Sequence, residues 1–169
     1  STDASGITDA ILSAIQPQMH TDIQFNCLLG KFFSDQYCKA LKKKYADGIN
    51  IHWIPWGPNM GELYARTDLM IAPAATMIYE AFTVGVPCIS YMFSDNQKDQ
   101  GFIMDYNNMA PCAGDFRCAI GKVQRNLMNL FVKMKSKTIR DQYQSRFFEL
   151  FDGRGANRIA EILLKEDAK

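Results

Sequence analysis

The clearest chemical signal in the sequence lies around Thr76 and Glu80, which follow a short apolar run. We expect a helix to begin near Thr76, and the free N–H groups and dipole of a helix N-terminus favour a bound phosphate. Glu80 lies about one helical turn later, so its carboxylate can face the same crevice and accept hydrogen bonds from two ribose hydroxyls. The alternative, which the spacing alone favours, is a Thr76 N-cap with a solvated Glu80.

A polar cluster, Ser94–Gln97, follows a second apolar run. Asn96 and Gln97 carry carboxamides, which both donate and accept hydrogen bonds and therefore suit sugar hydroxyls and acetamido groups. The alternative is that Ser94 or Asp95 caps the helix that follows.

Two other segments lie beside the ends of expected elements. Trp56 and Gly57 can form a wall for a planar base, although most tryptophans in such places pack in the core or at its rim. Thr2 and Asp3 precede an expected helix. They can cap it, or they can present backbone amides and a carboxylate to a diphosphate-linked sugar. Asp3 is the one group in the chain that we consider for catalysis.

Metal and covalent chemistry find little support in the sequence. Five cysteines are an odd number and include no CxxC pair, so we expect reduced, mostly buried thiols in a cytoplasmic protein. We expect neither of the two histidines, His20 and His52, to belong to a Ser-His-Asp or Cys-His catalytic set. The chain has neither a P-loop nor a Gly-x-Gly-x-x-Gly motif, and we predict no metal and no cofactor.

Length and composition indicate one compact domain. The chain has 169 residues, of which 47% are hydrophobic and 22% charged, as in ordinary globular proteins. The net charge of +1 gives no electrostatic argument for nucleic acid or an acidic membrane surface. No apolar run approaches the roughly 20 residues of a membrane-spanning helix, and the first residues do not read as a secretory signal.

The candidate residues must be positioned by alternating strands and helices. Apolar periodicity predicts strands at 23–29, 49–55, 68–72 and 87–92, and a short last strand near 109–112. It predicts helices at 7–15, 34–48, 58–64, 76–84, 97–107, 117–134, 137–150 and 155–166, with a turn at 152–155. Strands separated by single helices imply right-handed crossovers and a Rossmann-like α/β fold, in which helices flank a parallel sheet in three layers. Ligands of such sheets bind beyond the carboxyl ends of the strands.

Four segments, taken in order, resemble a known family. They are Asn59–Ile71, Thr76–Pro87, Asp95–Gln97 and Phe151–Ala160. Together they look like the C-terminal half of the UDP-sugar hydrolases of pseudaminic acid biosynthesis and the related spore-coat polysaccharide proteins. They are more distantly similar to the N-acetylglucosaminyl transferase that makes the lipid-linked peptidoglycan precursor. Those are GT-B proteins, in which two Rossmann-like domains hold a nucleotide sugar between them.

The resemblance implies that residues 1–169 form a single domain that binds a UDP-linked amino sugar. It belongs to a UDP-sugar hydrolase or glycosyltransferase of surface polysaccharide or nonulosonic acid biosynthesis. The family's preceding strand and N-terminal domain, which is thought to carry the hydrolases' catalytic His, are absent from this sequence. We therefore expect this chain alone to bind UDP or a UDP-sugar weakly and without turnover, and we expect an exposed gap or an aggregation-prone edge in its sheet.

The resemblance also implies a role for each candidate residue. Glu80 would hold the ribose, and the uracil would lie against Trp56 and Gly57. The diphosphate would be held by the main-chain amides of Ala75, Thr76 and Met77, and the sugar would be reached by Asn96 and Gln97. The phosphate side of the cleft would be bordered by Thr2 and Asp3. One departure is Ala74-Ala75, which stands where the family usually has Gly-Ser and is expected to hinder the approach of phosphate to the backbone slightly.

Two other functions remain open at this point. The first is a non-catalytic GT-B-like module fused to a sugar-activating enzyme, which would serve assembly alone and bind no nucleotide. The second is a complete small α/β phosphate-binding protein unrelated to sugar transfer, for which the sequence offers no phosphate-binding loop.

Overall fold

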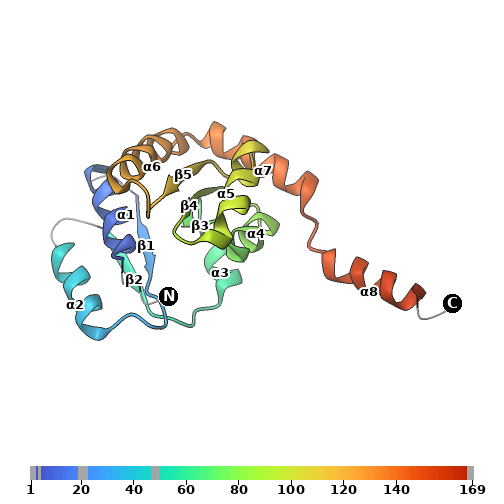
Figure 1. The fold of residues 1–169 in the computed structure, drawn as a ribbon, viewed down its shortest axis with the longest axis horizontal. Helices are drawn as coiled ribbons and strands as arrows, with labels where there is room; N and C mark the ends of the chain where they lie inside the picture. Colours follow the sequence, from blue (N-terminus) through green and yellow to red (C-terminus); the bar gives the residue numbers. More distant parts are fainter. Residues whose placement is uncertain (1–2, 4, 19–22, 47–49, 167–169) are drawn as a thin grey trace.

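The computed structural model describes residues 3, 5–18, 23–46 and 50–166, and strands alternate with helices along them (Figure 1). The strands are β1 (Phe25–Leu28), β2 (Ile51–Ile54), β3 (Met70–Pro73), β4 (Cys88–Met92) and β5 (Cys112–Asp115). The α-helices are α1 (Ile7–Ile15), α2 (Asp35–Lys44), α3 (Met60–Ala65), α4 (Thr76–Thr83), α5 (Lys98–Tyr106), α6 (Ile120–Met134), α7 (Lys137–Leu150) and α8 (Gly155–Glu166). Two 3₁₀ turns, η1 (Gln16–Gln18) and η2 (Asp95–Gln97), complete the order.

Every paired strand runs parallel to its neighbour, as the sequence predicts. β1 pairs with β2, Phe25 lying opposite Ile51. β4 lies between β3 and β5, and Met70 of β3 is opposite Cys88. However, the described strands form two sheets, β1–β2 and β3–β4–β5, rather than one. The Rossmann-like α/β class is confirmed, and the sheet is divided between β1 and β3.

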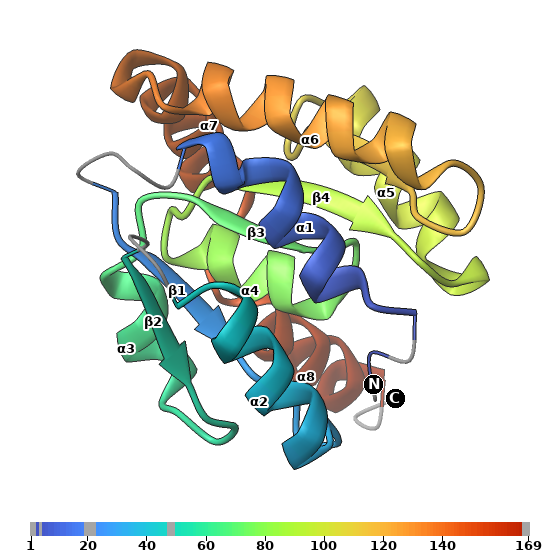
Figure 2. The same cartoon turned by 90° about the vertical axis from the view of Figure 1, so that its left-hand side faces the viewer.

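Helices cover both faces of the strands and give the predicted three layers. On one face, α1 and α6 pack side by side (Figure 2), and Leu12 and Leu127 are buried there with Ile89 of β4. On the other face, α4 and α7 bury Phe82 and Phe147 against a cluster that includes Cys88. Because successive side chains of a strand point to opposite faces, Cys88 and Ile89 divide the core into these two clusters.

Three predicted elements have a boundary that is wrong by three residues or more. The helix predicted over 34–48 ends at Lys44, where the Tyr45 N–H bonds to the Leu41 carbonyl. The last strand begins at Cys112, later than predicted, because Met109 and Ala110 donate their N–H groups to the Met104 carbonyl and close α5. The helix predicted from residue 117 begins at Ile120. Arg117 instead bonds the Asp115 carboxylate through its backbone N–H and its guanidinium, which makes a turn after β5.

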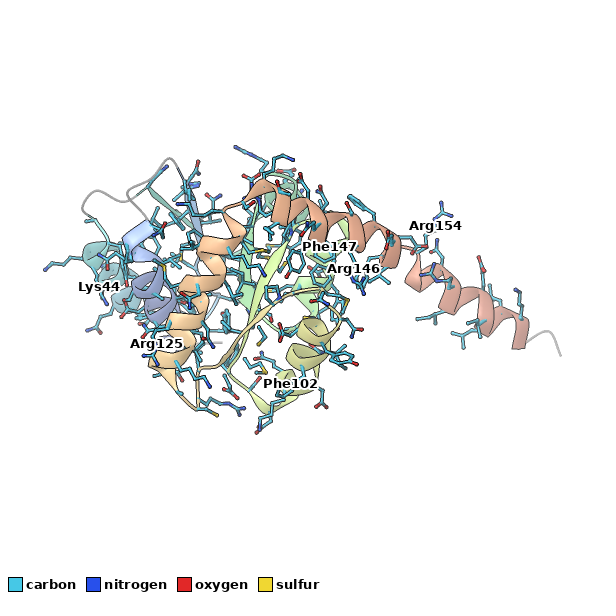
Figure 3. All side chains as sticks on the ribbon, turned by 90° about the horizontal axis from the view of Figure 1, so that it is seen from above. Lys44, Phe102, Arg125, Arg146, Phe147 and Arg154 are labelled. Carbon is cyan, nitrogen blue, oxygen red and sulfur yellow. The ribbon has the colours of Figure 1, made fainter. Side chains whose placement is uncertain are left out.

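The last helix, α8, extends away from the rest of the chain (Figures 1 and 3). The predicted turn before it is present, and Asp152 there accepts hydrogen bonds from the Arg154 N–H and the Arg158 guanidinium. These bonds, led by the one from Arg158, lower the pKa of Asp152 to about 2. The apolar residues Ile159, Ile162, Leu163 and Leu164 of α8 are exposed.

The five cysteines are free thiols, but the expectation that most are buried is wrong. Only Cys88 is buried; Cys118 is exposed and the other three are half-buried. Burial raises the pKa of Cys27 to about 12, so its thiol is a poor nucleophile. Among the helices that the structure describes, none combines the length and apolar character needed to cross a membrane.

Replacing Phe147 tests the packing of α7. Its ring is fully buried and stacks on Phe82 with 4.2 Å between centroids. Phe147→Ala is expected to lower the free energy of unfolding by about 3–5 kcal/mol, because truncating a buried aromatic leaves a cavity. The matched change Phe148→Ala, at a side chain 59% exposed, is expected to cost less than about 1 kcal/mol. Urea denaturation measures both, and equal losses would contradict this account of the core.

Candidate functional site

The predicted site residues fall at the carboxyl ends of the strands. Loop 55–59 follows β2, Ala74 and Ala75 follow β3, and residues 93–97 follow β4. Asp3 precedes α1. Their surroundings decide which of them can reach a ligand.

The N-terminus of α4 carries no side-chain cap. Its N-cap residue is Ala75, with extended backbone at φ −147°, so the alternative of a Thr76 N-cap is wrong. Ile78 donates its N–H back to the Ala75 carbonyl, whereas the N–H groups of Thr76 and Met77 bond to no acceptor in the described part of the chain. These amides stand at the positive end of the helix dipole, as an anion site requires.

The sequence predicts that Ala74 slightly hinders the approach of phosphate to the backbone. The placement of its side chain does not support this prediction. Its side chain is fully buried. It lies toward Gly101 of α5, where a Cβ would come within 3.6 Å of the Ala74 methyl group. The methyl group therefore points into the core rather than across the N-terminus of α4.

Glu80 is exposed and is held at one oxygen. The hydroxyl of Tyr64, a buried residue of α3, donates to Glu80 Oε2 at 3.2 Å and lies 3.4 Å from the Met77 carbonyl oxygen. Burial, followed by the Glu80 charge, raises the pKa of Tyr64 to about 12, so the hydroxyl remains a donor at neutral pH. Sequence reasoning placed Tyr64 in a helix and missed this role, which depends on the packing of α3 against α4.

The loop before α3 presents Trp56 to solvent. Trp56 is 60% exposed, and Gly57 adopts φ +101°, a conformation that favours glycine. The loop ends at Asn59, whose Oδ1 accepts the N–H groups of Gly61 and Glu62 and so caps α3. An exposed indole beside a fixed turn is available to stack on a planar group.

Asp3 accepts the first N–H groups of α1 from outside the N-cap position, which Gly6 holds, and so fills the capping role that is one of its two predicted roles. Its carboxylate accepts the N–H groups of Ile7 at 2.8 Å and Thr8 at 3.0 Å, and the Tyr37 hydroxyl donates to it at 2.7 Å. The contact with Tyr37 joins α1 to α2 and was not expected from the sequence. The role of Asp3 beside phosphate stays a prediction, and Thr2 lies outside the described residues.

The cluster Ser94–Gln97 is organised by its own hydrogen bonds. Gln97 is buried, and its Oε1 accepts the Phe93 N–H at 2.9 Å, whereas Asn96 is exposed. Ser94 is the N-cap residue of η2, but its hydroxyl donates to Asn96 and makes no capping bond, and the N-cap residue of α5 is Gln97. The alternative of a side-chain cap from Ser94 or Asp95 on α5 is therefore wrong. Asn96 is therefore the better placed of the two carboxamides to read a sugar.

Asp95 belongs to an ion-pair network at the same edge. Its carboxylate pairs with Lys98 and Arg117, each at 3.1 Å, and Arg117 also pairs with Asp115 at 2.7 Å. Hydrogen bonds from Lys98 and Arg117 hold the pKa of Asp95 below its ordinary value. The pKa of Asp115 is also below its ordinary value, chiefly because its carboxylate accepts a hydrogen bond from Arg117.

The structure brings together some of the predicted residues. Asp3, Trp56 and Met77 line one cavity of about 940 Å³, and Glu80 is joined to Met77 through Tyr64. The other described candidates do not line this cavity; they are Gly57, Ala75, Thr76, Glu80, Asn96 and Gln97. The cavity thus brings together one residue of the proposed uracil position, one of the diphosphate position and Asp3, and no residue of the proposed ribose or sugar positions.

The described residues contain no group of three or more His, Cys, Asp or Glu side chains placed to hold a metal ion. His52 is an exposed residue of β2, and His20 lies outside the described residues.

Comparison with known proteins shows the fold. No protein-family profile and no curated protein sequence matches the chain. Among solved structures, the chain is similar to MurG from Acinetobacter baumannii, with a TM-score of 0.75 and 16% sequence identity. The match covers 98% of this chain and 47% of that one, so this chain spans about half the length of MurG, a GT-B glycosyltransferase. The chain therefore has a Rossmann-like α/β fold that corresponds to one half of a GT-B protein.

Removing the Asp3 carboxylate tests its capping role. Asp3→Ala is expected to lower the free energy of unfolding by about 1–2 kcal/mol, because two N–H groups of α1 lose their acceptor. The control Asp35→Ala removes an exposed acid from the first turn of α2, where Ser34 is the cap, and is expected to cost less than about 0.5 kcal/mol. Thermal or urea unfolding measures both, and an Asp3→Ala variant as stable as Asp35→Ala would show that α1 does not need this cap.

Proposed function

We propose that the chain is the nucleotide-sugar-binding domain, the C-terminal half, of a GT-B glycosyltransferase or UDP-sugar hydrolase. Its ligand is a UDP-linked amino sugar used in surface polysaccharide or nonulosonic acid biosynthesis. The likeness to half of a GT-B glycosyltransferase supports the glycosyltransferase-type fold. The resemblance of its motifs to UDP-sugar hydrolases supports the choice of UDP.

One observation carries the proposal: the uncapped N-terminus of α4 lies one turn from a carboxylate held by Tyr64. The N–H groups of Thr76 and Met77 would hold the diphosphate. The exposed Glu80 carboxylate would accept hydrogen bonds from the ribose hydroxyls. The rise from Thr76 to Glu80 is about 6 Å along the helix, which is short enough for one nucleotide to reach both.

The remaining site residues would contact the two ends of the same ligand, the base at one end and the sugar at the other. Trp56, exposed beside the cavity that Met77 also lines, would stack on the uracil, with the Gly57 backbone at its edge. Asn96 would meet the sugar, with support from the Gln97 amide nitrogen. Ala75 would contribute backbone to the diphosphate site.

In the proposed reaction, the bond between the anomeric carbon and the diphosphate oxygen breaks. Water or an acceptor hydroxyl forms the new bond, and the departing UDP carries the electron pair. The N-terminus of α4 would stabilise the developing negative charge, and its preformed dipole needs no reorganisation as the charge develops. The base that activates the nucleophile would come from the other half of the GT-B protein, because the Asp3 carboxylate is occupied by α1 and Tyr37.

The proposed ligand and the role of Glu80 can be tested by calorimetric titration. The titration uses the full polypeptide that the gene encodes. UDP is expected to bind more tightly than CMP or ADP. Glu80→Gln is expected to weaken UDP binding by roughly tenfold or more, since hydrogen bonds to a charged acceptor contribute about 1.5–3 kcal/mol. The same variant should lose the preference for UDP over 2′-deoxy-UDP, because Glu80 is the proposed acceptor for the ribose.

Glu149→Gln is the matched control, because Glu149 is an exposed carboxylate on α7, away from the cleft. It is expected to bind UDP as the unchanged protein does. Equal affinity for UDP, CMP and ADP, or unchanged binding by Glu80→Gln, would reject the proposal. The absence of any nucleotide binding would favour the non-catalytic module instead.

A further inference from the structure

The pairing of β4 with β5 shifts in register just before both strands end. Between two paired positions, β5 advances three residues, from Cys112 to Asp115. β4 advances only two, from Ser90 to Met92. The extra residue makes a bulge, and Gly114 lies within it at φ +122°, a conformation that favours glycine. Since a bulge changes the direction of the side chains beside it, this one sets where Asp115 projects.

Asp115 fixes the side chain of Arg117. The Asp115 side chain is only 10% exposed. Its carboxylate accepts the Arg117 backbone N–H at 2.9 Å, and it also accepts the guanidinium at Nε, 3.0 Å away, and at Nη2, 2.7 Å away. A two-point contact between guanidinium and carboxylate is the strong geometry for such a pair. The Arg117 side chain is therefore oriented by its own turn.

The third guanidinium nitrogen reaches the loop between β4 and α5, residues 93–97. Arg117 Nη1 lies 3.1 Å from Asp95 Oδ1, so the guanidinium joins the turn after β5 to this loop. An isolated surface ion pair usually stabilises little, partly because two long side chains must be ordered to make it. Asp115 already orders the Arg117 side chain, so the contact with Asp95 loses little further entropy and can hold the loop.

Loop 93–97 is also closed by bonds within itself. Oε1 of the buried Gln97 accepts the Phe93 N–H at 2.9 Å. The Gln97 N–H donates to the Ser94 carbonyl at 3.2 Å. These bonds fix the shape of the loop, whereas the ion pair of Asp95 fixes it against a neighbouring segment, the turn after β5.

We propose that Arg117 is a positioning residue, which holds Asp95 and with it loop 93–97 in the arrangement that meets the sugar of a nucleotide sugar. This role rests on the proposed function, in which Asn96 and Gln97 reach the sugar. Asn96 directly follows Asp95, so a backbone shift at Asp95 also moves the Asn96 carboxamide. Because each guanidinium nitrogen already contacts a carboxylate, Arg117 acts through Asp95 rather than on the sugar itself.

Calorimetric titration of the full polypeptide with two ligands separates this role from nucleotide binding. Arg117→Gln is expected to bind UDP as the unchanged protein does, because the proposed UDP contacts lie at α4 and Trp56. It is expected to bind UDP-N-acetylglucosamine, the probe for a UDP-linked amino sugar, roughly threefold to tenfold more weakly. Arg117→Lys is expected to lose as much, since lysine keeps the charge but cannot contact both carboxylates with a planar fork.

Two further variants complete the titration. Arg125→Gln is the matched control, because Arg125 is an exposed arginine on α6, and it is expected to bind both ligands as the unchanged protein does. Asp95→Asn leaves the Arg117–Asp115 contact in place, so it tests the same link if Arg117→Gln does not fold. Combining Asp95→Asn with Arg117→Gln is expected to weaken binding no further than either change alone, because both break one contact.

Hydrogen exchange of single amides tests the positioning of the loop without any nucleotide. The amides of Phe93 and Gln97 are expected to exchange roughly threefold or more faster in Asp95→Asn and in Arg117→Gln than in the unchanged protein. The Ala74 amide, which donates to the Tyr91 carbonyl at 2.8 Å, is the internal control and is expected to stay unchanged.

The outcomes separate this proposal from the proposed function. Equal weakening of UDP and UDP-N-acetylglucosamine in the Arg117 variants, or no weakening of either, would overturn the role of Arg117 in sugar binding. Unchanged exchange at Phe93 and Gln97 would overturn the positioning of the loop. A protein that binds no nucleotide but shows faster exchange in these variants would reject the proposed function and support Arg117 as the residue that holds the loop.

Discussion

Parallel strands must satisfy their backbone on both sides, and this requirement organises the molecule. A strand directs alternate N–H and C=O groups to its two sides, so a strand with one neighbour has one side without a strand partner. β4 has both neighbours and is almost wholly buried, whereas β1 and β3 each have one and border a cavity of about 940 Å³. The order of the strands on the two sides of this cavity fixes where each loop of the candidate site leaves its strand.

The same arrangement produces the features that a nucleotide would contact. β3 ends at Pro73 and the chain passes through a fully buried Ala74, so α4 starts with its first amides at the edge of the sheet. α3 packs against α4 through Tyr64, whose hydroxyl fixes one oxygen of Glu80. A binding surface therefore arises from core packing, because the groups that hold Glu80 and α4 in place are buried residues rather than parts of a flexible loop.

Most elements could be predicted because their signals are local. Ser34 caps α2, and α4 ends where Gly85 adopts φ +83°. The site was predicted less well, since its details depend on contacts between distant segments. Gln97 turns inward to the Phe93 N–H, and Asp3 meets Tyr37 of α2. The last strand was misplaced because residues 109 and 110 have the apolar character of a strand but bond to the Met104 carbonyl. Periodicity cannot reveal a backbone bond of that kind.

The carboxylates of Asp3, Asp95 and Asp115 are each engaged by hydrogen-bond donors of the described chain. Near the cleft, the carboxylate of Asp3 is held by two amides and a tyrosine. Those of Asp95 and Asp115 are hydrogen-bonded by Lys98 and Arg117, which keep their pKa values low. A carboxylate with a low pKa is a weak base at neutral pH. Under the proposed function, the N-terminus of α4 would supply static charge stabilisation to the departing diphosphate, and the base would come from the other half of the GT-B protein.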